Sequence, residues 1–127
     1  MHMPSLRRPD LWLPPLALMA LIFAFSAQSS LEVGLGTFEL VGRKLVHFAE
    51  YALLCLLWLR AFEPGLGARR AALVGFLVTS GYAATDELHQ TFVEGRNGNP
   101  VDWLIDSAGA GLMAFLLRSG LPRRTAV

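Results

Sequence analysis

The segment ATDELHQTFVEGRNGNPVDWLID, residues 84–106, concentrates ionisable side chains in a chain that is otherwise strongly apolar. Its middle part, HQTFVEGRNGNP, is rich in the Gly, Asn and Pro residues that favour turns, whereas the sequence on either side continues into a long apolar run. Pro100 is typical of the first position of a helix. The segment therefore predicts the end of one helix, a loop and the start of the next helix, with charges gathered at one end of the pair.

Composition indicates a membrane protein. Of the 127 residues, 54% are apolar and only 17% are charged, whereas a soluble domain carries about 25% charged residues. The length allows one domain, which we place over residues 1–127. A net charge of +1 gives no reason to expect nucleic acid as a partner. The single cysteine, Cys55, lies in an apolar run and is interpreted as a small buried residue.

Four apolar runs account for most of the chain, and they cover residues 11–28, 45–62, 71–88 and 101–117. Each is near the lower limit of length for crossing a hydrocarbon core of about 30 Å at about 1.5 Å per residue. Short connections make consecutive helices antiparallel neighbours. The predicted fold is therefore all-α, a four-helix transmembrane bundle.

The basic residues predict the orientation of this bundle. Eight of the eleven Lys and Arg residues fall at the N-terminus, at the C-terminus, or in the region where the second run ends and the third begins, which includes Arg60. The other three, Arg43, Lys44 and Arg96, fall on the opposite side. Because positive residues favour the cytoplasmic side, we expect both termini in the cytoplasm.

The acidic residues are biased toward the opposite, outer side, where all four helix ends meet. Residues spaced by three and four positions share one face of a helix, which groups His47, Glu50 and Tyr51 on the second run. Asp86 shares a face with His89 or Gln90 on the third run, and Asp102 shares one with Asp106 on the fourth. Ionisable groups in spanning helices usually face the bundle interior. We therefore expect these residues to form a polar funnel that opens outward.

Several interpretations of these residues stay open. Asp102 fits a helix cap, whereas Asp106 lies one turn deeper than a cap. The pairs His47–Glu50 and Asp86–His89, each at a spacing of three, suit a divalent metal or a proton relay, and they equally suit structural hydrogen bonds or a metal-free site for an anionic or polar ligand. Asp86 and Glu87 end their helix where its dipole disfavours anions. The cations considered as their partners are Arg96, Lys44, a protonated His47 or His89, or a metal.

The motifs FSAQSS, RKLVHFAEYALL and TDELHQTFVEGRNGNPVDWLIDSAGAG resemble those of the VanZ-like family of small multi-pass bacterial membrane proteins. The resemblance covers about residues 26–117. The residues that carry it are Lys44, His47, Glu50, Tyr51, Asp86, Glu87, Gln90, Arg96, Asp102, Asp106 and Gly109. The family is named for an accessory protein of teicoplanin resistance, which implies work at the outer face of the cytoplasmic membrane, close to cell-wall precursors.

Three functions are compatible with these observations. In the first, the site binds a lipid-linked cell-wall precursor or a lipoglycopeptide: Lys44 and Arg96 contact phosphate, the acids hold a polar or cationic part, and Tyr51, Gln90 and Asp102 complete the ligand contacts. In the second, an enzyme acts on an envelope lipid or a lipid-linked sugar, with a catalytic set of His47, Glu50, Asp86, Glu87 and Asp106. A metal-assisted form of this enzyme would hold a divalent metal with His47, Glu50, Asp86 and His89. In the third, the charges only fasten the helix ends of a structural subunit. Membrane lipids are partners in all three.

Overall fold

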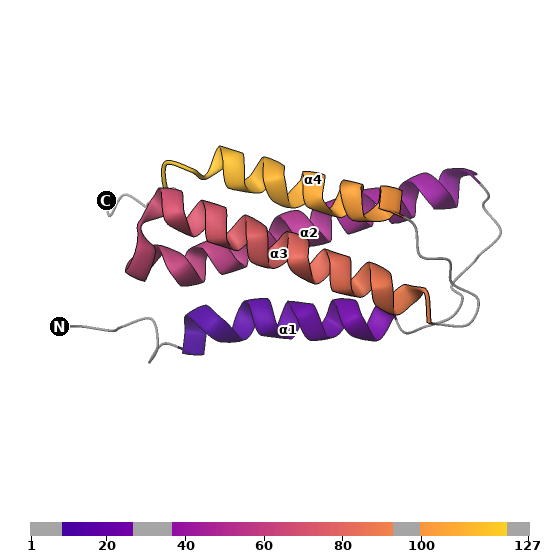
Figure 1. Cartoon of the computed structure of the whole chain (residues 1–127), viewed down its shortest axis with the longest axis horizontal. Coiled ribbons are helices and arrows are strands. Elements are labelled where there is room, and N and C mark those ends of the chain that lie inside the picture. The colour runs from indigo at the N-terminus through magenta and orange to yellow at the C-terminus, as the bar shows by residue number, and fades with distance from the viewer. Residues whose placement is uncertain (1–8, 27–36, 93–99, 122–127) are drawn as a thin grey trace, which may run out of the picture.

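The fold, seen in a computed structural model of the chain, is built from four α-helices (Figure 1). The structure describes residues 9–26, 37–92 and 100–121, and these ranges contain no strand. The helices are α1 (Pro9–Ser26), α2 (Thr37–Leu66), α3 (Ala68–Gln90) and α4 (Pro100–Leu116). The predicted all-helical class and the four helices are confirmed. The predicted start of the fourth helix at Pro100 is confirmed as well.

The connection between α2 and α3 is shorter than the sequence pattern suggests. The segment EPGLGARR, residues 63–70, was expected to separate the helices, but α2 runs on through Pro64 to Leu66 and α3 begins at Ala68. The chain leaves helical geometry at Gly67, whose φ of 82° is accessible to glycine at little cost. Gly67 alone therefore makes the reversal, and α2 is 30 residues long.

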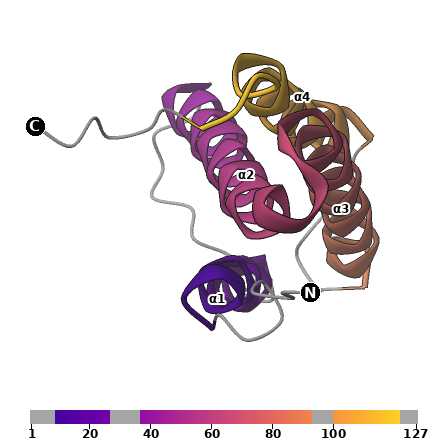
Figure 2. The same ribbon diagram turned by 90° about the vertical axis from the view of Figure 1, so that its left-hand side faces the viewer.

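Helices α2, α3 and α4 form a closely packed unit, and α1 lies against α2 and α3 on one side of it (Figure 2). Consecutive helices run in opposite directions (Figure 1), as expected. Glycines allow the closest approaches within the unit: an added side chain at Gly75 of α3 would meet the backbone of Cys55 and Leu59 in α2 at 3.3–3.5 Å. Small residues at such crossings are typical of packed membrane helices.

Helix α1 is attached at its start and near its middle. Near its middle, the hydroxyl group of Tyr82 in α3 donates a hydrogen bond of 2.5 Å to the carbonyl oxygen of Met19. At its start, the guanidinium group of Arg60 in α2 donates to the carbonyl oxygen of Asp10 at 3.1 Å. Trp12 also makes edge-on ring contacts with Trp58 and Phe62 of α2. Trp58 is buried in this aromatic contact between helices.

Large apolar side chains are widespread on the surface, and small or polar side chains occupy much of the interior. Buried positions include Thr79, Asp86 and Asp106 together with the alanines 61, 71, 72, 83 and 110. The exposed large apolar residues come from all four helices and include Leu13, Leu16, Leu21, Val41, Leu45, Leu53, Leu73, Leu77, Leu104, Leu112 and Phe115. By length and hydropathy, one helical stretch of the described residues, Val41–Leu66, qualifies as a membrane span, and Pro9–Ala24 is a shorter apolar helix.

Candidate functional site

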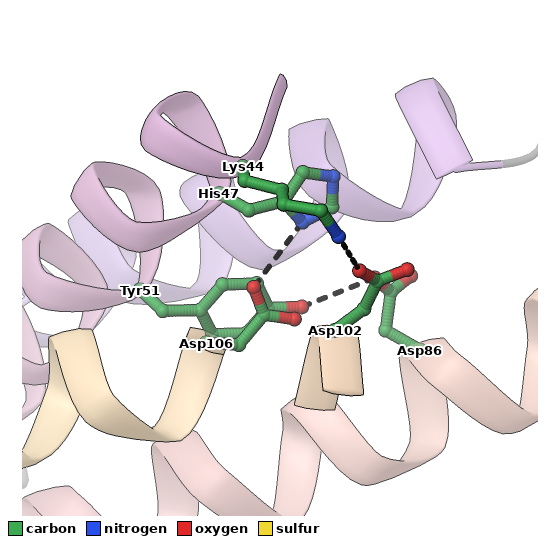
Figure 3. A network of polar contacts seen from close by, with 6 residues as sticks. All are labelled: Lys44, His47, Tyr51, Asp86, Asp102 and Asp106. Carbon is green, nitrogen blue, oxygen red and sulfur yellow. Dashed lines mark hydrogen bonds and ion pairs between the residues drawn. The ribbon is translucent and has the colours of Figure 1, made fainter. Parts of the chain in front are cut away.

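Six polar side chains from three helices meet near the end of the bundle where α2 and α4 begin and α3 ends (Figure 3). We call this group the polar cluster. Three come from α2, one from α3 and two from α4, and three contacts between helices connect them in pairs. Its members are Lys44, His47, Tyr51, Asp86, Asp102 and Asp106.

The first contact joins His47 of α2 to Asp106 of α4. The Nδ1 atom of His47 lies 3.3 Å from Oδ1 of Asp106, and the Asp106 side chain is 2% exposed, whereas the imidazole is 29% exposed. This distance is longer than the ~2.7–2.9 Å of a strong charge-assisted hydrogen bond, and neither atom makes a hydrogen bond. Figure 3 shows the second ring nitrogen of His47 directed away from Asp106. Asp106 therefore lies beside one ring nitrogen of His47, and the other ring nitrogen points away from this contact.

The second contact joins Tyr51 of α2 to Asp86 of α3. The Tyr51 hydroxyl group donates a hydrogen bond of 3.1 Å to Oδ2 of Asp86. Tyr51 is fully buried and Asp86 is 3% exposed. The sequence suggested only cations as partners of Asp86. The structure shows that the neutral hydroxyl group of Tyr51 is a hydrogen-bond donor to it. Because a carboxylate removed from water needs hydrogen-bond donors, this bond helps to hold Asp86 in the interior.

The third contact is an ion pair between Lys44 of α2 and Asp102 of α4. The ammonium group donates a hydrogen bond of 2.7 Å to Oδ1 of Asp102, and the two side chains are 34% and 32% exposed. Lys44 precedes His47 by three residues and Asp102 precedes Asp106 by four. The ion pair therefore lies one helical turn closer to the end of the bundle than the His47–Asp106 pair. It forms the accessible part of the polar cluster.

The close approach of α4 to α2 makes these contacts geometrically feasible. Gly109 lies three residues after Asp106, and an added side chain at this position would clash with the carbonyl oxygen of Phe48, the residue that follows His47. Gly109 is buried. The absence of a side chain at Gly109 therefore lets α4 approach α2 closely next to the His47–Asp106 contact.

The other predicted acids lie around the polar cluster. Glu50 is half-buried and close enough to interact electrostatically with His47, Asp106 and Asp86. Glu87 is half-buried at the end of α3. Glu50 therefore adds a further carboxyl group beside the polar cluster.

The predicted metal ligands are not assembled into one group. Within residues 9–26, 37–92 and 100–121, no three His, Cys, Asp or Glu side chains are grouped as ligands of a metal ion. The ring of His89 stacks on Phe23 of α1, with ring centres 4.5 Å apart. The set His47, Glu50, Asp86 and His89 therefore remains a prediction from the sequence, and the structure places His89 against Phe23 of α1.

Some predicted ligand contacts lie outside the described residues. Arg96, which was expected to contact phosphate, is one of them, and so is the side chain of Gln90. Both therefore remain predictions from the sequence.

Sequence reasoning missed a polar contact between α3 and α4. The hydroxyl groups of Ser80 and Ser107 share a hydrogen bond of 2.8 Å, and the indole N–H of Trp103 donates to the carbonyl oxygen of Ser80 at 3.1 Å. Ser107 directly follows Asp106. This contact could have been suspected from the sequence, because serines on adjacent antiparallel helices often form hydrogen bonds between membrane helices. This contact stabilises the part of α4 that presents Asp106.

The chemistry of the polar cluster is acidic. It contains three aspartates against one lysine and one histidine. Two of the aspartates, Asp86 and Asp106, are almost fully buried, and buried carboxylates are strongly stabilised by nearby cations or hydrogen-bond donors. Such a site can accept a cationic or hydrogen-bond-donating group and, through His47, can move a proton.

Comparison with known proteins places the chain in a family. A family model described as VanZ/LLP1 matches residues 10–121, which include all four helices except the first residue of α1. No curated protein and no solved structure gives a significant match.

Proposed function

The chain belongs to the VanZ/LLP1 family, and we propose that it is a four-span protein of the bacterial cytoplasmic membrane. In this proposal the polar cluster faces outward and binds the polar head of a lipid or lipid-linked component of the cell envelope. The observation that carries the proposal is the position of the cluster: three helices bring Lys44, His47 and three aspartates together at one end of an otherwise apolar bundle.

The distribution of side chains supports the membrane assignment for all four helices. Large exposed apolar residues occur on each of the four helices, which is the distribution expected of a bundle surrounded by lipid. Helix α4, with 17 residues, is about 25 Å long at about 1.5 Å per residue, close to the thickness of a hydrocarbon core. In α3 the charged residues Arg69, Arg70, Asp86 and Glu87 lie near the two ends.

The basic residues support the outward orientation of the cluster. Arg60, Arg69, Arg70 and Arg118 lie toward the end of the bundle opposite the polar cluster. The positive-inside rule assigns that end to the cytoplasm. The cluster then lies at the outer surface, where lipid-linked precursors of the cell wall carry their polar heads.

Exposure within the cluster supports a binding role. Lys44 and Asp102 are about one-third exposed, whereas Asp86 and Asp106 are buried beneath them. A head group can therefore meet the outer ion pair first and the deeper carboxylates next. Arg96 would contribute a phosphate contact in this proposal.

The proposal is tested by analysing what the detergent-purified protein retains. Mass spectrometry of extracted lipid and elemental analysis of the protein are performed on the wild type, on His47→Ala and on Arg69→Gln, which removes an exposed charge at the opposite end. We expect the wild type and Arg69→Gln to retain one envelope lipid at a higher proportion than in the bulk membrane. His47→Ala should remain folded and should lose this lipid. Retained lipid of bulk composition in all three proteins would contradict the proposal.

A second function, catalysis on an envelope lipid, is favoured by the His47–Asp106 pair. A histidine oriented by a carboxylate through one ring nitrogen is the arrangement of a general base. In this alternative His47 would remove a proton from a hydroxyl group or water, Asp106 would orient it, and Arg96 would stabilise developing negative charge. Product analysis after incubation with membrane lipids tests it: Asp106→Asn should abolish turnover in a folded protein. Unchanged turnover would exclude this role.

A contribution to teicoplanin resistance is a further prediction from the family resemblance. Expression of the chain in a susceptible Gram-positive host should raise the inhibitory concentration of teicoplanin, and His47→Ala should abolish the increase. An equal increase with the variant would separate resistance from the polar cluster.

A further inference from the structure

We propose that the head group bound at the polar cluster carries a primary ammonium group next to a phosphate, as phosphoethanolamine does. This inference rests on the proposed binding function and names its ligand class. In the inferred complex Lys44 contacts a phosphate oxygen, and the ammonium group lies between Asp102 and Asp106. The following observations favour this class over purely anionic head groups.

The charge of the cluster is the first observation. Three aspartates face one lysine and one histidine, and Glu50 adds a fourth carboxylate nearby. A ligand that brings only negative charge would increase repulsion in a region where charges are poorly screened. A ligand that brings an ammonium group instead adds a positive charge beside Asp102 and Asp106, which have only Lys44 and His47 as ion-pair partners in the described residues.

The hydrogen bonding of Asp106 is the second observation and is independent of the charge count. Asp106 is 1% exposed, and its Oδ1 atom makes no hydrogen bond, with only the ion-pair contact of 3.3 Å to His47. Buried carboxylate oxygens normally have a hydrogen-bond donor. A primary ammonium group has three N–H donors, so it can bond to Asp106 and to Asp102 together.

The Lys44–Asp102 ion pair explains why the ligand should carry both charges. This pair lies one turn outside Asp106, and its 2.7 Å hydrogen bond uses the only lysine of the cluster. A phosphate that takes Lys44 leaves Asp102 without its cation. A head group with an adjacent ammonium group replaces both partners at once, because its phosphate pairs with Lys44 while its ammonium group pairs with Asp102.

Competition binding with matched lipids tests the inference. The full-length protein, delipidated in detergent, is titrated with phosphatidylethanolamine, phosphatidylglycerol and phosphatidylcholine of identical acyl chains, and bound lipid is counted by native mass spectrometry. We expect phosphatidylethanolamine to bind on the order of tenfold more tightly than either competitor. Phosphatidylcholine should bind weakly because its quaternary ammonium group has no N–H donor. Soluble glycerophosphoethanolamine is included, and its competition would indicate that the head group alone suffices.

Variants connect the preference to named residues. Asp102→Asn should reduce the preference for phosphatidylethanolamine over phosphatidylglycerol at least several-fold, and Lys44→Met should weaken the binding of both lipids. Glu63→Gln, which removes a carboxylate at the opposite end of the bundle, is the matched control and should retain the preference. Elution of each variant as a monodisperse species verifies folding.

Two results would overturn the inference and are distinguishable from failure of the proposed function. Tighter binding of phosphatidylglycerol, or equal binding of the three lipids with sensitivity to Lys44→Met, would reject the ammonium requirement and leave a head-group site in place. If all variants bind each lipid as the wild type does, no lipid binds at the polar cluster. This result would reject both the inference and the proposed binding function.

Discussion

Gly109 of α4 packs directly on the carbonyl oxygen of Phe48 in α2, with no space for a side chain between them. Phe48 follows His47, and Gly109 lies three residues after Asp106. The backbone contact and the His47–Asp106 contact are therefore parts of the same crossing of the two helices. Any change that separates the backbones at Gly109 also separates the imidazole from the carboxylate.

Replacing Gly109 should destabilise the protein and disrupt the polar cluster. Gly109→Ala introduces a Cβ that clashes with Phe48, and overpacking of this kind costs about 1–3 kcal/mol. Gly109→Leu should cost more. Thermal unfolding in detergent, followed by circular dichroism, measures the change.

Gly81→Ala is the control for this substitution. Gly81 lies within α3, is exposed, and has no atom within 4 Å of an added Cβ. Alanine favours helix over glycine by about 0.5–1 kcal/mol, so this variant should be as stable as the wild type or slightly more stable. A Gly109→Ala protein as stable as Gly81→Ala would show that α4 does not approach α2 this closely.

The pairing of His47 with Asp106 predicts non-additive effects of substitution. His47→Leu leaves the buried Asp106 without its partner and should destabilise the fold by about 1–3 kcal/mol. The double variant His47→Leu/Asp106→Leu removes both polar groups and should recover much of that loss. Additive losses in a double-mutant cycle would show that the two residues are not coupled.

The free energy of unfolding should depend much less on the Lys44–Asp102 pair than on the His47–Asp106 pair. Both side chains are about one-third exposed, and exposed ion pairs contribute about 0–1 kcal/mol. The free energies of unfolding of Lys44→Met and Asp102→Asn should therefore lie within about 1 kcal/mol of the wild-type value. A loss as large as that of His47→Leu would indicate that the pair fastens the helices, as in a purely structural role for the charges.

The four helices and their common polar end could be predicted because apolar length and turn-forming residues act locally. Pro100 and the turn-rich residues before it define the start of α4 without reference to tertiary structure. The α2–α3 connection could not be delimited in this way. Several breakers lie between Glu63 and Arg70, and packing decided that Gly67 alone leaves helical geometry.

Helix periodicity predicted which side chains share a face, and topology predicted which faces meet. Predicting which residues of different helices pair requires the axial position and rotation of each helix relative to its neighbour. These depend on close contacts such as that of Gly109 with Phe48. The pairing of Tyr51 with Asp86 is therefore visible only in three dimensions. His89 has the spacing of a metal ligand, but it lies against Phe23 because α1 covers that side of α3.

The orientation of the bundle is testable with single cysteines, because the native Cys55 is fully buried and should not react with polar reagents. Phe92 is 80% exposed at the end that holds the polar cluster, and Ser119 is exposed beyond α4 at the opposite end. In whole cells, Phe92→Cys and Asn97→Cys should react with a membrane-impermeant maleimide, and Ser119→Cys should react only after lysis. The unmodified chain, which retains Cys55, is the control for background labelling. Labelling of Ser119→Cys in whole cells, with Phe92→Cys protected until lysis, would place the polar cluster in the cytoplasm. The site would then meet cytoplasmic head groups, and the proposal of a partner at the outer face would fall.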